Sequence, residues 1–322
     1  MINTNAMRVL ALAGGVGGAK LASGLADILG ERLTVLVNTG DDFEHLGLRI
    51  SPDLDTVMYT LAGLANPETG WGLAGESWTF MEQVARLGGP TWFRLGDRDL
   101  ATHAVRTQRL NAGEALSGIT ADLCRALGVK STVLPMTDNR VRTMVYSGSQ
   151  RLAFQDYFVR LKCAVPVNSL SFDGASDASF NMALHHLCRN ADPLAIIVCP
   201  SNPYLSIDPI LALPRICTWI KSTGAPVIAV SPIVGGSAIK GPAAKIMREL
   251  GLQPSAVAVA RHYQGLINGF IIDQADAERA EEIAQLGIAV RSTQTVMRTQ
   301  DDRVSLAGEC LALANAVANK LV

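Results

Sequence analysis

The sequence predicts an α/β protein with a Rossmann-like, mostly parallel sheet, helices on both faces of that sheet and an inserted helical region. An apolar segment at Arg8–Ala13 runs into a glycine-rich turn, a helix and a second apolar segment at 33–38, which is the opening of a parallel α/β sheet. Unbroken apolar runs recur at 195–199 and 225–230 and suit strands covered on both faces. The region 53–127 shows helical patterns without a clear strand between them.

The remaining elements follow from the same periodicities. Strands are predicted at 8–13, 33–38, 195–199 and 225–230, with weaker strands at 269–273 and 288–291. Helices are predicted at 19–29, 178–189, 243–250, 277–285 and 305–320. Short strands at 131–134 and 142–146 are candidates for an antiparallel edge. We therefore expect a core made of 8–52 and 128–322, with 53–127 as a helical insert.

Composition excludes several classes of function. The 28 Lys and Arg residues against 29 Asp and Glu residues give a net charge of −1, without the basic excess of a nucleic-acid binder. Aromatic residues make up 5%, which disfavours a surface for base stacking. The six cysteines contain no CxxC pair, and no apolar run is long enough to span a membrane. These features predict a cytoplasmic protein with free thiols.

The first candidate site is the glycine-rich turn that follows the first strand. Gly14, Gly15, Gly17 and Gly18 let the backbone approach an anion, and Lys20 adds a positive charge. The turn is not a dinucleotide fingerprint, because Lys20 stands where its third glycine belongs, and the residues around the lysine also break the Walker pattern. A tight strand–helix turn without a ligand is the alternative interpretation.

Acidic residues follow the second predicted strand and open the helical insert. Asn38, Asp41 and Asp42 stand at the strand end, where ligands of open α/β sheets bind. Paired carboxylates there suit Mg²⁺ or the hydroxyls of a nucleotide, although a solvated acidic turn has the same composition. Asp53 suits the start of the next helix as a cap, and Asp55 would face the same pocket from its first turn.

Three further segments carry polar groups at expected loops. The segment 94–99 alternates charges and reads equally well as a surface ion-pair network. Ser201 and Asn202 follow a buried strand. Gly235 and Gly236, continuing to Lys240 and Lys245, resemble a second anion-binding turn. Phosphate-binding turns with acids at strand ends are the equipment of phosphoryl or nucleotidyl transfer.

Taken in order, these segments resemble a known family. The set includes Asn38-Thr39-x-Asp-Asp, 51–57, 95–99, 134–138, 154–156, 200–203 and 231–233 beside the glycine turn. It is similar to the 2-phospho-L-lactate transferase family of coenzyme F420 biosynthesis from residue 8 almost to the C-terminus. No single motif is specific, but eight motifs in this order are.

The resemblance implies a transferase. Its acceptor would be Fo, the deazaflavin 7,8-didemethyl-8-hydroxy-5-deazariboflavin, and its donor a guanosine diphosphate ester of a phospho-acid. The ribitol hydroxyl of Fo would attack the phosphorus nearer the acid and release GMP, which gives a form of coenzyme F420-0. The resemblance further implies Mg²⁺ as cofactor and a homodimer, whereas the composition and the lack of a long apolar run predict no nucleic-acid or membrane partner.

The resemblance also suggests roles for individual residues. Asp55 and Arg94 match the positions that bind Fo, and the catalytic candidates are Asp41, Asp42 and Asp55. The metal candidates are Asp41, Asp42, Asp53 and Asp55. The phosphate- and guanylate-binding candidates are Gly14, Gly15, Gly17, Gly18, Lys20, Asn38, Ser201, Asn202, Gly235, Gly236 and Lys240.

Two other functions compete with this one. A related group of regulators binds uridine-diphosphate sugars and shares the glycine opening, but would lack the motifs at 51–57 and 95–99. A nicotinamide-dependent dehydrogenase needs an intact glycine fingerprint and an acid in place of Asn38. The sequence leaves the donor acid open among phospholactate, phosphoenolpyruvate and 3-phosphoglycerate.

Overall fold

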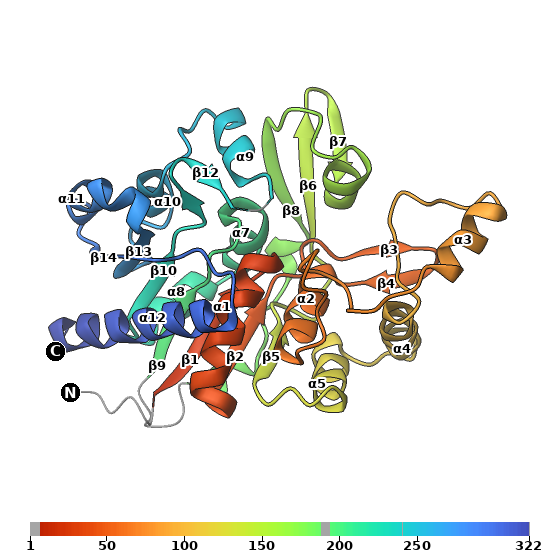
Figure 1. Ribbon diagram of the computed structural model, residues 1–322, viewed down its shortest axis with the longest axis horizontal. Helices are drawn as coiled ribbons and strands as arrows, with labels where there is room; N and C mark the ends of the chain where they lie inside the picture. Colours follow the sequence, from red (N-terminus) through yellow and green to blue (C-terminus); the bar gives the residue numbers. More distant parts are fainter. Residues whose placement is uncertain (1–6, 188–193, 240, 322) are drawn as a thin grey trace.

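The computed structural model describes residues 7–187, 194–239 and 241–321 and is built around a seven-stranded sheet (Figure 1). All of its neighbouring strands pair in parallel, in the order β14-β13-β10-β9-β1-β2-β5. Its strands are β1 (Arg8–Ala13), β2 (Leu33–Val37), β5 (Thr132–Pro135), β9 (Leu194–Val198), β10 (Val227–Val230), β13 (Gly269–Asp273) and β14 (Ala289–Thr293). The predicted α/β class with a mostly parallel sheet is therefore confirmed.

The chain starts in the middle of the sheet and builds it in two directions. From β1 it moves outward through β2 to β5, and from β9 it moves the other way through β10 and β13 to β14. The direction of winding therefore reverses between β1 and β9, which pair with each other. Loops that leave two such strands diverge and open a crevice at their carboxyl ends, where ligands of this fold class bind.

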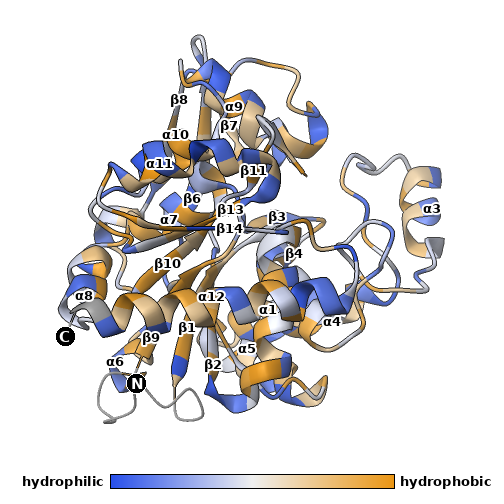
Figure 2. Cartoon of the chain, turned by 60° about the vertical axis from the view of Figure 1, so that its left-hand side comes forward, coloured by the Kyte–Doolittle hydropathy of each residue, from blue (hydrophilic) through white to orange (hydrophobic). Residues whose placement is uncertain are grey.

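Apolar residues on both faces explain why the strands lie inside the protein. Along β1, Val9 and Ala11 belong to one buried cluster, whereas Leu10 and Leu12 belong to another. Figure 2 shows the strands as mostly apolar segments beneath the helices. Burying both faces requires helices on both sides of the sheet, and this is the arrangement that the structure has.

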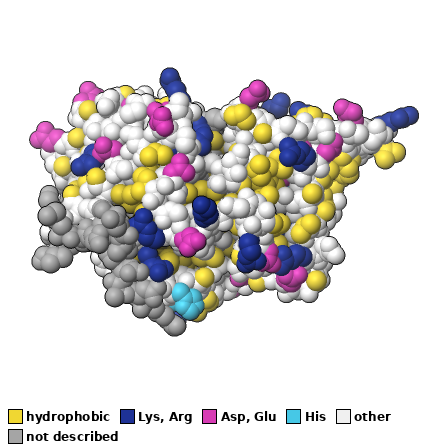
Figure 3. Space-filling view, turned by 60° about the horizontal axis from the view of Figure 1, so that its bottom comes forward, with side chains coloured by type: hydrophobic (Ala, Val, Ile, Leu, Met, Phe, Trp, Pro, Cys, Tyr) yellow, Lys and Arg dark blue, Asp and Glu magenta, His cyan; other side chains and the backbone are white. Residues whose placement is uncertain are grey.

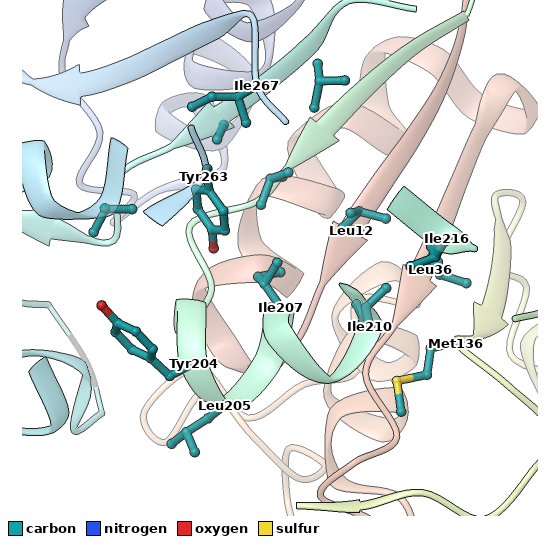
Figure 4. Packing of buried hydrophobic residues seen from close by; sticks show 14 of the residues in the cluster. Leu12, Leu36, Met136, Tyr204, Leu205, Ile207, Ile210, Ile216, Tyr263 and Ile267 are labelled. Carbon is teal, nitrogen blue, oxygen red and sulfur yellow. The ribbon is translucent and has the colours of Figure 1, made fainter. Parts of the chain in front are cut away.

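Different helices cover the two faces. One face packs against α1 (Gly15–Leu29), α2 (Pro52–Leu61), α5 (Leu116–Ala126) and α12 (Gln300–Leu321). The other packs against α6 (Leu184–Leu187), α7 (Asp208–Leu211), α8 (Ile216–Ser222), α9 (Ala243–Glu249), α10 (Ala256–His262) and α11 (Ala280–Ala284). Figure 4 shows part of that second cluster, in which Ile207 and Ile210 lie beneath Leu12 and Leu36 of the sheet.

The inserted helical region contains four helices between the second strand and β5. They are α2, α3 (Thr79–Arg86), α4 (Asp99–Asn111) and α5. Pro52 occupies the first turn of α2, where its missing N–H costs nothing. The helix α3 projects from the body of the molecule at the right of Figure 1. The division into a core and an insert remains a prediction.

Several elements differ from the prediction. The strands β3 (Phe43–His45) and β4 (Leu48–Ile50) form an antiparallel hairpin that the sequence analysis missed. β5 is a parallel edge strand, and the antiparallel pairing belongs to a separate sheet of β6 (Arg142–Ser147), β7 (Gln150–Ala153) and β8 (Ser169–Asp173). A two-stranded ribbon, β11 (Ile233–Val234) and β12 (Ser237–Ala238), completes the strands.

Several helix boundaries also differ from the prediction. The helix α1 begins at Gly15 rather than Ala19, so most of the predicted glycine turn is its first turn. Of the helix predicted at 178–189, only α6 is helical among the described residues, and residues 188 and 189 lie outside them. The short helices are η1 (Gly30–Arg32), η2 (Asp156–Arg160), η3 (Ala175–Asp177), η4 (Pro203–Ile207) and η5 (Gln274–Arg279).

The surface agrees with the charge balance of the sequence. On the face in Figure 3, Lys and Arg lie among Asp and Glu instead of forming one basic surface. Among the described residues, no helix combines the length and the apolar character needed to cross a membrane.

The close contact between α1 and α12 predicts that one methyl group added at Gly24 lowers the stability of the fold. A Cβ at the buried Gly24 would lie 2.1 Å from the carbonyl oxygen of Arg303, so the two helices would have to move apart. We expect Gly24→Ala to lower the free energy of unfolding by about 1–3 kcal/mol despite alanine's higher helix propensity.

Gly118 is the matched control, because it is exposed in α5 and a Cβ there meets nothing within 4 Å. Gly118→Ala should raise the free energy of unfolding by up to about 1 kcal/mol. Urea unfolding measures both variants. Equal stabilisation by the two substitutions would contradict the close helix contact.

Candidate active site

A cavity of about 650 Å³ opens at the carboxyl ends of β1, β2, β9 and β10. The predicted site residues that line it are Gly14, Gly15, Gly17, Lys20, Asp41, Asp53, Asp55, Arg94, Ser201 and Asn202. Residues from five separate stretches of the chain thus meet in one place. The strand-end prediction placed them together because parallel strands end at the same edge.

The glycine turn packs tightly against the loop that follows β9. The N–H of Gly14 donates to Ser201 Oγ at 3.1 Å. A Cβ would lie 2.4 Å from the Pro200 carbonyl oxygen at Gly17, and 2.4 Å from Ser201 Oγ at Gly18. These glycines are therefore needed for packing between protein segments. The sequence analysis explained the glycines by close approach of an anion. That explanation stays a prediction for Gly14, Gly15 and Gly17, which line the cavity.

Asp53 lies at the amino end of α1. Its Oδ1 accepts the N–H of Gly15 at 2.7 Å, and a Cβ on Gly14 would meet its Oδ2 at 2.4 Å. A carboxylate is stabilised there by the helix dipole and by the backbone donors that lack a partner within the helix. The next residues of α1, Val16 and Gly17, also have N–H groups without a partner in the helix, and both residues line the cavity.

Asn38 joins Asp53 to Asp41. Its Nδ2 donates to Asp41 Oδ1 at 2.9 Å and to Asp53 Oδ2 at 3.0 Å, while its Oδ1 accepts the N–H of Gly40 at 2.8 Å. Burial raises the pKa of Asp53 to about 6. Burial, helped by the charge of Asp53, raises the pKa of Asp41 well above its ordinary value. Two crowded acids that share one amide form an electrostatically strained pair, which a cation would relieve.

Asp42 lies behind this pair and does not line the cavity. Its Oδ2 accepts the hydroxyl of Ser51 at 2.7 Å, and its buried Oδ1 has no hydrogen-bond partner. Burial raises the pKa of Asp42 to about 7, although the charge of Arg142 opposes that rise. Asp42 therefore contacts a ligand in the cavity only if the surrounding loop moves.

Asp55 is held by residues of α4. Arg106 donates to both of its oxygens, through Nη1 to Oδ2 at 3.0 Å and through Nη2 to Oδ1. The Nδ1 of His103 lies 3.7 Å from Asp55 Oδ2, and its Nε2 lies 3.3 Å from Asp99 Oδ2. Asp99 also accepts the hydroxyl of Tyr59 at 2.5 Å.

Sequence reasoning missed Tyr59 and Arg106. The available signal was their spacing, since Asp55 and Tyr59 are one turn apart on α2, and Asp99, His103 and Arg106 share one face of α4.

The segment 94–99 divides between the surface and the cavity. Exposed Asp97 accepts the N–H groups of Thr79 and Phe80 at 2.9 Å each, so it caps the start of α3. Arg98 binds the carbonyl oxygen of Ala74 at 2.7 Å. Asp99 and Arg94, by contrast, line the cavity. Part of this charged segment thus lies at the surface, but Asp97 and Arg98 bind backbone groups there and do not form the ion-pair network of the alternative interpretation.

Aromatic side chains form another part of the cavity lining. The guanidinium of Arg94 lies over Trp78, 3.9 Å from the ring centroid. The sequence analysis did not select these aromatic residues, because nothing in their spacing brings them together. Those that line the cavity are Trp71, Trp92, Phe93, Phe154 and Phe158. We call the part of the lining formed by these residues the aromatic end, and the part formed by the glycine turn with Asp41 and Asp53 the polar end.

Other predicted binding residues have assigned contacts. Lys20 donates through Nζ to the carbonyl oxygen of Met297 at 2.8 Å. Asn202 accepts the N–H groups of Tyr204 and Leu205 through Oδ1, so its Nδ2 faces the other way and is buried without a partner. Asn202 thus offers a fixed donor at the polar end of the cavity.

The second predicted anion-binding turn is only partly at the site. Gly235 and Gly236 lie in the β11–β12 turn, where the Gly235 N–H donates to Asp276 Oδ2 at 3.0 Å. Neither glycine lines the cavity, and neither do Asn38 and Gly18. Lys240 lies outside the described residues. Lys245 binds Glu249 and the Val165 carbonyl oxygen.

One group of acids and a histidine has atoms close enough to share a metal ion. Among the described residues, Asp55, Asp99 and His103 offer ligand atoms within 4.8 Å of one another. The four predicted metal ligands do not form such a group together. Asp41 and Asp53 converge on Asn38, whereas Asp55 turns toward Arg106.

Comparison with known proteins gives the same family along most of the chain. A family model described as "2-phospho-L-lactate transferase CofD" matches residues 9–305. A Streptomyces griseus protein named "Phosphoenolpyruvate transferase" is 42% identical over 318 residues, covering 97% of this chain and 99% of its own. A Mycobacterium leprae protein of the same name is 39% identical over 340 residues, covering 97% of this chain and 100% of its own.

Solved structures agree on the fold. The crystal structure of protein BH3568 from Bacillus halodurans matches with a TM-score of 0.61 at 16% identity, covering 95% of this chain and 99% of that one. At this identity the likeness concerns the fold alone.

The buried acids predict a pH-dependent stability. An acid whose pKa is raised by folding stabilises the native state below its unfolded pKa of 3.8, and this contribution disappears as pH rises to about 7 for Asp42. Asp42→Asn should remove this loss, which amounts to a few kcal/mol because one pKa unit corresponds to about 1.4 kcal/mol.

Urea unfolding between pH 4 and 8, with chelator present, measures the effect. Wild-type stability should fall more steeply with pH than that of the variant. Parallel curves would mean that Asp42 is not the buried acid described here.

Proposed function

We propose a specific reaction for this chain, which belongs to the CofD family of 2-phospho-L-lactate transferases and is an enzyme of coenzyme F420 biosynthesis. It transfers a phospho-acid group from a guanosine diphosphate ester to the ribitol hydroxyl of Fo. The hydroxyl oxygen forms a bond to the phosphorus nearer the acid, the bond from that phosphorus to the GMP oxygen breaks, and the hydroxyl proton is lost. GMP leaves, and a form of coenzyme F420-0 remains.

The names of the relatives favour one donor among the three that the sequence left open. Proteins about 40% identical across almost the whole chain are named phosphoenolpyruvate transferases. We therefore propose that the phosphoenolpyruvate moiety is the group transferred. Phospholactate and 3-phosphoglycerate esters are the competing donors.

The polar end of the cavity supports a place for the guanylated donor. The backbone donors at the start of α1 and the fixed amide of Asn202 can bind phosphate oxygens, and Lys20 adds a positive charge. Ser201 supports the turn through Gly14. Asn38 supports it indirectly by holding Asp41 and Asp53. Phosphate fixed at this end would leave the transferred group pointing into the cavity.

The aromatic end supports a place for Fo. A deazaflavin ring is flat and aromatic, and Trp92, Phe93 and Phe158 offer flat aromatic surfaces for it to pack against. Arg94 is half-exposed at this end, and its stacking on Trp78 fixes the direction of its guanidinium. Asp55 also lines the cavity, so its carboxylate can accept a hydrogen bond from the ribitol hydroxyl.

The residues at the polar end fit a magnesium ion. Mg²⁺ prefers carboxylate oxygens, and burial of Asp41 and Asp53 makes their joint ionisation costly without a cation. We propose these two as the metal ligands. Asp42 lies behind them, bound to Ser51, and Asp55 already has a cationic partner in Arg106. When bound, the ion would neutralise charge on the phosphate oxygens.

A cytoplasmic location and a homodimer remain part of the proposal. The charge balance of the surface gives no reason to expect a nucleic-acid partner.

The reaction predicts Fo-dependent release of GMP. With Fo, Mg²⁺ and the guanylated phosphoenolpyruvate, the protein should release GMP in equal amount to a product whose mass is that of Fo plus the phospho-acid. Parallel incubations with the phospholactate and 3-phosphoglycerate esters identify the preferred donor. GMP release that is the same without Fo, or its absence with all three donors, would refute the transferase reaction.

The metal proposal predicts that chelation abolishes turnover and that Mg²⁺ restores it. Asp41→Asn and Asp53→Asn should each raise the Mg²⁺ concentration for half-maximal rate by about tenfold or more. Asp177→Asn is the control, because Asp177 is exposed away from the cavity lining. Full activity after thorough chelation would count against the metal.

A further inference from the structure

Five polar side chains form a continuous chain between α2 and α4. Asp55 and Tyr59 come from one helix, and Asp99, His103 and Arg106 from the other. Tyr59, His103 and Arg106 are each about 1% exposed. Burying this many polar groups is costly, the more so because Arg106 Nε and His103 Nε2 have no hydrogen-bond partner.

Arg106 is the centre of the chain. Its two terminal nitrogens hold both oxygens of Asp55, and Nη1 also lies 3.4 Å from His103 Nδ1. Because a guanidinium can only donate hydrogen bonds, His103 Nδ1 must be the acceptor in this contact. The ring proton of a neutral His103 then sits on Nε2, which faces Asp99 at 3.3 Å. One guanidinium thereby orients a carboxylate and an imidazole.

The same geometry argues against a metal ion bound by Asp55, Asp99 and His103. Such an ion would stand next to a buried guanidinium that stays charged, and two like charges repel strongly in a dry interior. Arg106 already neutralises Asp55. The group is therefore better described as a chain of ion pairs and hydrogen bonds than as a metal site.

Arg106 itself does not line the cavity, whereas Asp55 does. Any effect of Arg106 on a ligand therefore passes through the side chains that it holds, and of these Asp55 is gripped at both oxygens, whereas His103 is contacted at one nitrogen. A buried ion pair adds little net stability over an apolar contact, but a two-point fork fixes the direction of a carboxylate far better than a single contact. Removing that fixation leaves Asp55 free to rotate away from the cavity.

We propose that Arg106 is a positioning residue that fixes the Asp55 carboxylate for the acceptor hydroxyl. This inference rests on the proposed function, in which Asp55 faces the ribitol chain of Fo. It assigns the α4 helix a part in the reaction, because a displacement of about 1 Å at the reacting groups can cost a hundredfold in rate.

Two substitutions test the role of Arg106. Arg106→Gln removes the charge and the fork, and Arg106→Lys keeps the charge but replaces the fork with a single point. We expect kcat/KM for Fo to fall by at least about tenfold in the glutamine variant and less in the lysine variant, as displaced groups react more slowly. Affinity for GDP, measured on the same samples, should stay within about twofold because the two ends are separate.

Arg109→Lys is the matched control on the same helix. Arg109 is partly exposed and pairs with Glu114 and Asp122, away from the cavity. It should behave as the wild type in both measurements. Equal losses for Fo and GDP in Arg106→Gln would indicate general damage and overturn the inference.

A double-mutant cycle with Asp55→Asn separates positioning from structural support. If Arg106 acts through Asp55, adding Arg106→Gln to Asp55→Asn should reduce turnover little further, and additive losses would overturn the inference. If Arg106→Gln does not fold, the same measurements are made on Arg106→Lys and on the double variant Asp55→Asn/Arg106→Gln, in which neither side chain is charged. Wild-type protein that makes no Fo-derived product refutes the proposed function, whereas wild-type conversion with an unaffected Arg106→Gln refutes only this inference.

Discussion

The close approach of three segments at the carboxyl edge of the sheet is the constraint on which the site depends. The first turn of α1, the loop after β9 and the start of α2 meet where no Cβ fits at Gly14, Gly17 or Gly18. These segments line the cavity that opens at the carboxyl ends of β1 and β9. Their contact also brings Asp53 onto the amino end of α1, so the architecture of the sheet and the acidic end of the cavity are set by one contact.

Electrostatic strain follows from that packing. Asp41 and Asp53 share a single amide donor from Asn38, and burial raises the pKa of each. Asp55 escapes this crowding because α4 supplies Arg106. The cavity therefore contains Asp55, which is compensated within the protein, and the pair Asp41 and Asp53, which is not. This difference gives nearby carboxylates distinct chemical roles and explains why we assign the cation to the pair.

The sequence predicted the parts of this structure that depend on local pattern. Continuous apolar strands indicated the parallel sheet. Because ligands of such sheets bind at the strand ends, the sequence also predicted that Asp41, Asp53 and Ser201 share one site, and all three line the cavity. The predicted start of α1 was too late, because glycines are poor helix formers and local pattern does not show their packing against Pro200 and Ser201. Asp55 and Arg106 are 51 residues apart, and no local pattern predicts that they pair. The aromatic end was missed for the same reason.

The central claim is that donor phosphate binds at the glycine end and Fo at the aromatic end of one cavity. A crystal structure with Fo and GDP bound together tests it most directly. The account predicts GDP phosphates against the first turn of α1, and the deazaflavin ring against Trp92 with its ribitol chain toward Asp55. A ring on the glycine turn with phosphates beside Arg94, or either ligand outside this cavity, would contradict it.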